Sequence, residues 1–278
     1  MKKTSIKLIL LALSTASTAG VANAGEESNS NAISVRWGPA FAEPGVNGKI
    51  AKKIYNFTHV GHDSLGLNLV SGDLLISDGN DPASGGGGGA QEFYGFYQRT
   101  FSLSAISGRQ IGKGLIKDLS IYGRFDANTK NIDFAPRVRK YRLGLSADLP
   151  VAAGFWEVSV GAYQEQNHNG IVIPVVKPMG TDVSFRTVPE IMSSWLIPMG
   201  PVGTFEGYAD YVAAKGRNGF GIETAAEVHA QATVMFNLGG PRSAWQLGVG
   251  VERWVHKYGE SGTGSKQTTG LVLLRYKL

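Results

Sequence analysis

Cysteine is absent from this chain, and no long apolar run follows its N-terminal segment. Without cysteine there is no disulfide scaffold, no cysteine-ligated zinc site and no thiol nucleophile. A transmembrane helix needs roughly 20 predominantly apolar residues, and no segment beyond residue 24 supplies them. If this chain enters a bilayer, it must do so as a closed barrel, because an open sheet edge in lipid leaves backbone groups unpaired.

A strong excess of one charge is also missing once the N-terminal segment is set aside. The formal net charge is +5, from 27 Lys and Arg against 22 Asp and Glu. Residues 1–24 hold three lysines and no acidic residue, which leaves 24 basic and 22 acidic side chains in the rest. A nucleic-acid partner would require a clustered basic surface. We therefore expect no nucleic-acid binding.

The N-terminal segment itself predicts export. Its lysines precede the apolar run 8–13, and small residues follow as far as Ala-Asn-Ala at 22–24. This is the pattern of a secretory signal peptide with an A-x-A cleavage site, and the apolar run is too short for an anchor helix. We predict cleavage of residues 1–24 and a single domain over 25–278.

Apolar and polar residues alternate with period two along much of the remaining chain. In the segment 227–236 one face carries Val228, Ala230, Ala232, Val234 and Phe236, and the other carries Glu227, His229, Gln231, Thr233 and Met235. Met235 is the one departure from the template. The segments 118–125, 140–149, 156–162, 205–211 and 245–251 alternate in the same way. Period two predicts strands, since a helix would mix the two sets on every face.

The polar faces favour a membrane barrel over a soluble β-domain. Their many charges would be costly in a dry core, whereas a water-filled lumen hydrates them. We predict an all-β fold, a transmembrane antiparallel up-and-down β-barrel. The chain offers about 12 candidate strands between residues 33 and 278, and such barrels close on an even number of strands. The expected location is the bacterial outer membrane, in contact with its lipids and lipopolysaccharide.

The last strand adds a second indication of the same fold. Val272, Leu274, Tyr276 and Leu278 share one face, while Arg275 and Lys277 point the other way. A terminal strand of this kind resembles the signal that the barrel-assembly machinery recognises. That signal normally ends in Phe, and Leu278 departs from it.

Three segments resemble one family of outer-membrane proteins. They are GVGVERWVHKYG at 248–259, WGP at 37–39 followed by IYNFTH at 54–59, and EFYGFYQR at 92–99. Each is similar to a segment of the Tsx-like nucleoside-specific channel-forming outer-membrane proteins. The resemblance implies a monomeric twelve-stranded barrel with a narrow channel for passive diffusion of nucleosides or similar small polar solutes.

The alternation also indicates which side chains line such a channel. A nucleoside has a flat aromatic face and a polyhydroxyl sugar, so a selective pore needs aromatic walls beside hydrogen-bonding charges. The inward candidates for substrate binding are Glu92, Tyr94, Tyr122, Arg124, Arg142, Glu157, Tyr208 and Glu227. For each of them the alternative is a lumen residue that balances a neighbouring charge and touches no solute.

Two other functions are compatible with an outer-membrane barrel. One is a non-conducting surface barrel that acts in adhesion or as a phage or colicin receptor. The other is a lipid-modifying enzyme, for which His59 or His62 with Asp63 and Ser64 is the available combination. We expect no catalytic site and no cofactor, because this combination lacks a recognisable sequence context. We also expect no metal, because a spacing of three places the rings of His59 and His62 on opposite faces of a strand.

Overall fold

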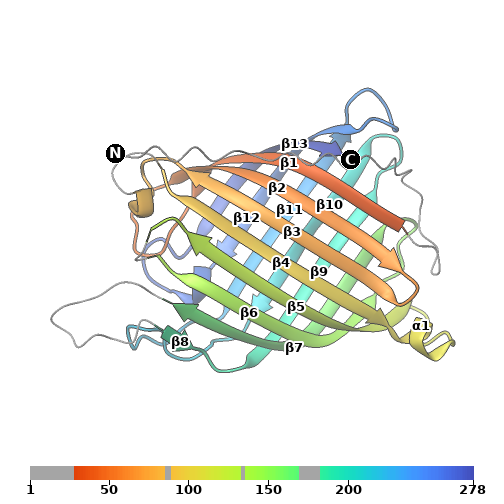
Figure 1. Ribbon diagram of the computed structural model, residues 1–278, viewed down its shortest axis with the longest axis horizontal. Coiled ribbons are helices and arrows are strands. Elements are labelled where there is room, and N and C mark those ends of the chain that lie inside the picture. The colour runs from red at the N-terminus through yellow and green to blue at the C-terminus, as the bar shows by residue number, and fades with distance from the viewer. Residues whose placement is uncertain (1–27, 85–88, 133–134, 169–181) are drawn as a thin grey trace, which may run out of the picture.

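The strands of this protein close into one antiparallel barrel (Figure 1). The computed structural model describes residues 28–84, 89–132, 135–168 and 182–278, so the predicted signal peptide lies outside the described residues. The strands are β1 (Ser28–Phe41), β2 (Ile50–Asp63), β3 (Gly66–Ser77), β4 (Gln91–Ser102), β5 (Asp118–Lys130), β6 (Arg137–Asp148), β7 (Phe155–His168), β8 (Asp182–Ser184), β9 (Val188–Pro198), β10 (Gly203–Val212), β11 (Glu227–Asn237), β12 (Trp245–Val255) and β13 (Gln267–Lys277).

Twelve of these strands form the barrel wall, which confirms the predicted fold. Each pairs with the next along the chain, and β13 pairs with β1 to complete the ring. Strand β8 stands apart because it pairs only with the end of β7, beyond the part of β7 that pairs with β9. None of the described helices is long and apolar enough to cross a bilayer.

The two ends of the barrel differ in their connections. One end, the loop end, carries the described connecting residues 42–49, 78–84, 89–90, 131–132, 135–136, 185–187, 213–226 and 256–266. The other, the terminal end, carries the start of β1, the end of β13 and the segments 64–65, 103–117, 149–154, 199–202 and 238–244. Helix α1 (Leu103–Ser107) lies at the terminal end and β8 at the loop end (Figure 1).

Local chemistry explains the tightest of these connections. The Asp63 carboxylate accepts hydrogen bonds from the backbone N–H groups of Leu65 and Gly66, at 2.9 and 3.0 Å. Gly66 adopts φ +152°, and a Cβ at this position would lie 2.2 Å from the carbonyl oxygen of Thr100. The side chain of Asp63 and the missing side chain of Gly66 therefore allow β2 to reverse into β3 in two residues.

The outward face of the barrel is an apolar belt. Exposed aliphatic side chains include Val35, Val70, Ile121, Leu143, Val160, Ile191, Val249 and Val272. Exposed aromatic side chains flank them, with Trp37, Tyr55, Phe93, Phe125, Tyr141 and Tyr211 toward the loop end and Phe101, Trp156, Phe236 and Trp245 toward the terminal end. An apolar belt between two aromatic girdles is the surface that a bilayer covers.

The inward face is polar over most of the barrel, but one sector is apolar. Phe41, Ile50, Ile54, Met235, Leu271 and Leu273 pack together there as buried side chains, and we call them the apolar cluster. Met235 is fully buried in this cluster, which accounts for its departure from the polar template of β11. The inward face is therefore apolar along part of β1, β2, β11 and β13.

Candidate functional site

The eight side chains predicted to line the lumen belong to strand faces that point inward. They are Glu92, Tyr94, Tyr122, Arg124, Arg142, Glu157, Tyr208 and Glu227. Each has a hydrogen-bond or ion-pair partner among the described residues. Balancing a neighbour is therefore a role that the structure gives to all eight, and contact with a solute stays a prediction.

Four of the eight meet in one ion network. Arg142 on β6 lies 3.4 Å from Asp126 on β5, 3.2 Å from Glu190 on β9 and 3.5 Å from Asp210 on β10. Asp126 also pairs with Arg124 at 2.7 Å and accepts a hydrogen bond from Tyr94. Asp126 is 0% exposed and Glu190 is 1% exposed. The expectation that water solvates the inward charges therefore fails here, because opposite charges are paired with one another.

Tyr122 joins the network by crossing two strands. Its hydroxyl donates to Glu190 at 2.8 Å, although Tyr122 lies on β5 and Glu190 on β9. Glycines on the strands between make room for the side chain: a Cβ would lie 2.9 Å from the Tyr122 ring at Gly144 and 2.4 Å from its hydroxyl oxygen at Gly161. The two glycines thus form a trough in which Tyr122 lies across the wall.

A second group, which we call the aromatic group, lies near the loop end of β10, β11 and β12. The rings of His229 and Trp254 stack with centroids 3.9 Å apart and planes 9° apart. Tyr208 meets His229 edge-on at 5.1 Å, and Tyr258 meets Trp254 edge-on at 5.0 Å. The His229 side chain keeps 19% of its surface exposed. Part of this group is therefore accessible from the lumen.

Charged groups surround these rings. The Trp254 indole N–H donates to Glu227 at 2.7 Å, and the carboxylate of Glu252 lies 3.4 Å from His229. The ammonium group of Lys257 lies 4.9 Å from the centre of the Trp254 ring. An aromatic surface bordered by carboxylates and a cation can stack a flat solute and hydrogen-bond its polar edge.

A third group, the mouth cluster, joins loops to strands at the loop end. The Glu43 carboxylate faces three ammonium groups, Lys52 at 2.6 Å, Lys257 at 3.5 Å and Lys130 at 3.8 Å. Burial raises the pKa of Glu43, but the three lysines outweigh burial and hold that pKa well below its usual range. Burial lowers the pKa of the Lys257 ammonium group by more than Glu43 raises it.

The wall beside the apolar cluster carries its own ion pairs. Arg36 on β1 binds Asp73 on β3 at 2.5 Å and Gln231 on β11 at 3.1 Å. Nearer the terminal end, Arg275 on β13 donates to Glu206 on β10 at 2.9 Å. Long side chains thus extend across the barrel interior at several heights and narrow it.

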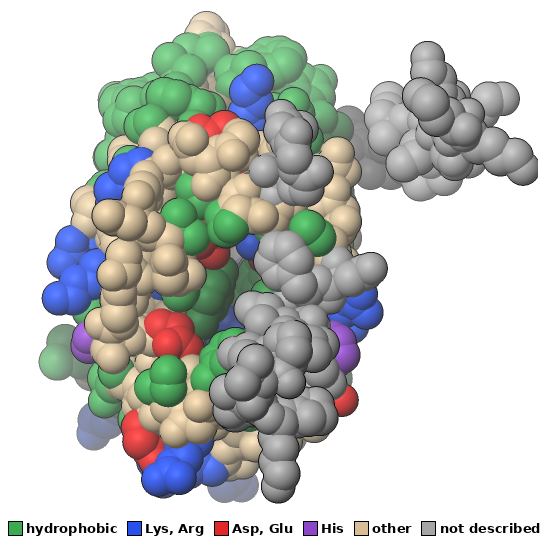
Figure 2. Space-filling model, turned by 90° about the vertical axis from the view of Figure 1, so that its left-hand side faces the viewer, with side chains coloured by type: hydrophobic (Ala, Val, Ile, Leu, Met, Phe, Trp, Pro, Cys, Tyr) green, Lys and Arg blue, Asp and Glu red, His purple; other side chains and the backbone are tan. Residues whose placement is uncertain are grey.

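The loop end is hollowed at its centre (Figure 2). Hydrophobic and acidic side chains are visible inside the hollow, and basic side chains are scattered around its rim. This face is the one at which the mouth cluster and the aromatic group lie. The hollow is the candidate entrance for a solute.

Two members of the combination considered for lipid chemistry, His59 and Asp63, have other partners. His59 lies on the outward face of β2, and its Nδ1 is 2.8 Å from Asn31. Asp63 is bound to Arg99 at 2.8 Å as well as to the β2–β3 turn. A nucleophilic serine needs a base within hydrogen-bond reach. Here the His59 ring contacts Asn31 and the Asp63 carboxylate binds Arg99.

Several functional candidates escaped prediction from the sequence. Asp210 lies in an alternating segment and Asp126 directly follows one, whereas Glu190 lies outside all of them, and nothing in the sequence marks the three as partners of Arg142. Glu43 belongs to a connection, and no strand pattern places it inside the barrel. The spacing of Glu252, Trp254 and Lys257 in the Tsx-like segment was the available signal for the aromatic group.

No family model matches the chain, and no curated protein matches it. Among solved structures, a KdgM porin aligns over 88% of this chain and 98% of its own, at 10% identity and a TM-score of 0.43. The translocator domain of the autotransporter NalP from Neisseria meningitidis aligns over 89% of this chain and 88% of its own, at 11% identity and a TM-score of 0.44. Salmonella typhi OmpF in complex with daunomycin aligns over 92% and 98%, at 11% identity and a TM-score of 0.31. These similarities are too distant to assign a role to any residue of this chain.

Proposed function

We propose that this protein is an outer-membrane channel through which nucleosides or similar small polar solutes diffuse passively. The observation that carries the proposal is the stacked pair of His229 and Trp254, which lies on the inward face among carboxylates and remains partly exposed. Transport of this kind breaks no bond and needs no cofactor. Selectivity depends on lumen width and on the groups that line it.

The apolar belt supports placement in a membrane. A closed barrel leaves no unpaired backbone edge, and its exposed aliphatic side chains would be an aggregation hazard in water. Most of the longer connections lie at the loop end, and the connection 103–117 at the terminal end is the exception. In outer-membrane barrels the longer loops lie outside the cell, so the aromatic group lies near the external entrance.

The aromatic group supports selectivity for solutes with a flat ring. Stacking of a base on an aromatic side chain contributes about 1–3 kcal/mol. The carboxylates of Glu227 and Glu252 would accept hydrogen bonds from base or ribose donors. This is the solute class that the Tsx-like segments imply, and Trp254 belongs to one of those segments.

Conductance of the purified protein in planar bilayers tests the proposal. We expect adenosine and uridine to reduce ion conductance at lower concentrations than glucose or ribose does. Trp254→Ala should weaken the nucleoside effect by about tenfold, which corresponds to about 1.4 kcal/mol of lost stacking. Trp245→Ala is the matched control, because this tryptophan faces outward on the same strand and is 47% exposed.

Two results would contradict this function. Conductance that ignores nucleosides up to millimolar levels leaves only a general pore. An equal effect of Trp254→Ala and Trp245→Ala removes the aromatic group as the selective element.

The ion network favours one second candidate, a surface barrel that does not conduct and acts in adhesion or as a phage or colicin receptor. Tyr122, Asp126 and Glu190 are almost fully buried, as they would be in a plugged lumen. Zero conductance from a correctly folded barrel would support this alternative and exclude the channel.

A further inference from the structure

Basic side chains on the outward face of the barrel are gathered at the loop end. Lys53, Arg137, Arg139 and Arg253 are exposed on the outward faces of β2, β6 and β12, each toward the loop end of its strand. The one outward acidic residue on the described parts of the twelve barrel strands is Asp63, which lies at the terminal end and is paired with Arg99. The outward surface near the external entrance is therefore positively charged.

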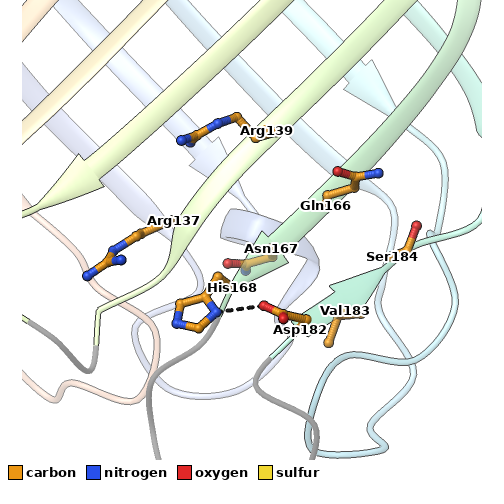
Figure 3. Close-up of a pocket in the computed structure, with 8 residues that line it drawn as sticks. All are labelled: Arg137, Arg139, Gln166, Asn167, His168, Asp182, Val183 and Ser184. Carbon is orange, nitrogen blue, oxygen red and sulfur yellow. Dashed lines mark hydrogen bonds and ion pairs between the residues drawn. The ribbon is translucent and has the colours of Figure 1, made fainter.

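Two of these residues border a groove. Arg137 and Arg139 lie two positions apart on β6, so their side chains project from the same face about 7 Å apart. The groove has a volume of about 560 Å³, and its other walls are Gln166, Asn167 and His168 of β7 and Asp182, Val183 and Ser184 of β8 (Figure 3). Strand β8, which takes no part in closing the barrel, thus forms one side of it.

The guanidinium groups of Arg137 and Arg139 supply hydrogen-bond donors to the groove. Arg139 uses one guanidinium nitrogen for the carbonyl oxygens of Asn128 and Val138, at 3.2 and 2.9 Å. Within the described ranges, Arg137 makes no ion pair. The acidic group in the groove, Asp182, is held by His168 at 2.6 Å. An anion entering the groove would meet two guanidinium groups, and a guanidinium binds phosphate oxygens in bidentate fashion.

The height of the groove determines which anion it meets. The next outward residue of β6 toward the terminal end is Tyr141, whose ring contacts that of Phe125 at 5.3 Å, and Leu143 and Leu145 follow it. Aromatic girdles lie at the level of lipid headgroups. Arg139 and Arg137 lie further toward the loop end of β6 than Tyr141. Their side chains therefore reach the level of the headgroup phosphates of the outer leaflet.

We propose that Arg137 and Arg139 form a binding site for the phosphate of a phosphorylated glycolipid, the lipopolysaccharide class, in the outer leaflet. The side chains of Gln166 and Ser184 hydrogen-bond the sugar beside that phosphate. The site rests on the proposed placement in the outer membrane, but not on conductance. It would fix the barrel's height in the bilayer.

Lipid binding by the purified protein in detergent, measured by native mass spectrometry, tests the site. The probes are bis-phosphorylated lipid A, its dephosphorylated form and phosphatidylglycerol. We expect the phosphorylated glycolipid to bind most tightly, and the double variant Arg137→Gln with Arg139→Gln to weaken it by about tenfold or more. The dephosphorylated form should bind both proteins equally.

The double variant Lys53→Gln with Arg253→Gln is the matched control, because it removes the same charge from other outward positions. We expect it to change binding less than about twofold. An equal loss in both double variants, or equal binding of phosphorylated and dephosphorylated lipid A, would overturn the site. Equally tight binding of phosphatidylglycerol that depends on the same arginines would overturn the assignment to a glycolipid.

Single-channel conductance tests the lipid-binding site and the proposed channel function independently of each other. All four substitutions lie on the outside of the barrel, so single-channel conductance should be unchanged in both variants. A barrel that binds lipid A through the arginines but conducts nothing would retain the site and lose the channel.

Discussion

The apolar cluster and the ion network are both buried inside the same barrel, yet they are built on opposite principles. In the apolar cluster, Leu271 and Leu273 pack with Met235 and Ile54. Burial of each such side chain stabilises the fold by about 1.5–3 kcal/mol, and this stabilisation does not depend on the orientation of the contacting groups. In the ion network, Asp126 and Arg142 lose water and regain interaction only through well-placed partners.

This difference separates stability from specificity. Replacing a buried ion pair by apolar residues is often neutral for stability, whereas removing one partner is strongly destabilising. The apolar sector therefore holds β13 against β1 and β2, while the network fixes the geometry of the facing wall. The aromatic group is partly exposed and is left as the surface that a solute can reach.

The largest expected effect is that of Asp126→Ala. The substitution leaves Arg124 and Arg142 facing each other without their shared carboxylate, and should cost about 3–5 kcal/mol in the free energy of unfolding. Urea unfolding of the protein in phospholipid vesicles, followed by tryptophan fluorescence, measures it. A loss below about 1 kcal/mol would mean that water replaces the carboxylate and that the network is solvated.

Leu271→Ala should come next, with a loss of about 3 kcal/mol from the cavity that it leaves. Conductance and nucleoside response should stay the same, because the apolar cluster contributes to packing and not to the lining charges. The neighbouring Val272→Ala is the control, since lipid covers its outward side chain and fills the space. If Leu271→Ala changed selectivity as much as stability, the separation between the two regions would fail.

Gly161→Ala should be milder, at about 1–3 kcal/mol, because the added methyl group meets the Tyr122 hydroxyl in the trough and lies 2.6 Å from the Leu143 carbonyl oxygen. In a Tyr122→Phe background the same change should cost less, since the hydroxyl oxygen that it meets at 2.4 Å is gone. Unfolding of the two single variants and the double variant forms the cycle that measures this coupling. If the losses in the free energy of unfolding of the two single variants simply added up in the double variant, Gly161 would not make room for the Tyr122 hydroxyl.

Glu43→Gln should have the smallest effect, and one that shrinks in acid. The pKa of Glu43 is held below its usual range because the three lysines outweigh burial. Its contribution to stability is therefore fully present above the unfolded pKa of about 4.3 and is lost as pH falls through the lower folded value. Unfolding free energies measured from pH 6 to pH 2 should show the gap between wild type and variant narrowing. A gap that stays constant would mean that Glu43 does not depend on the lysines.

The barrel was predictable because alternation reports the orientation of each side chain directly. On β11 the inward set Glu227, His229, Gln231, Thr233 and Met235 follows from the sequence and is confirmed. The same rule fails for Leu271 and Leu273, because period two distinguishes the faces only when their residues differ in polarity. The run 271–274 is apolar throughout, so its inward face gave no signal.

The contacts across the lumen were out of reach for another reason. Whether Tyr122 meets Glu190 depends on how far each strand is staggered and on glycines at the strands between, and neither follows from one segment alone. Glu43 and Lys257 belong to connections between strands, where there is no period-two alternation to indicate which way a side chain points. Sequence therefore supplied the list of inward residues but not their partners.

The pairing of β1 with β13 has a consequence for assembly kinetics. All other wall pairings join strands that follow one another along the chain, so they can zip up as successive hairpins with little loss of loop entropy. The seam, with Ala32 opposite Lys277 and Trp37 opposite Val272, forms only after the whole chain is present. The first and last described strands meet at this seam, where the Leu278 N–H donates to the Asn31 carbonyl oxygen at 2.9 Å. Circular permutants that link the start of β1 to the end of β13 and open the chain in a loop-end connection should therefore keep the barrel while moving its slowest closure step elsewhere.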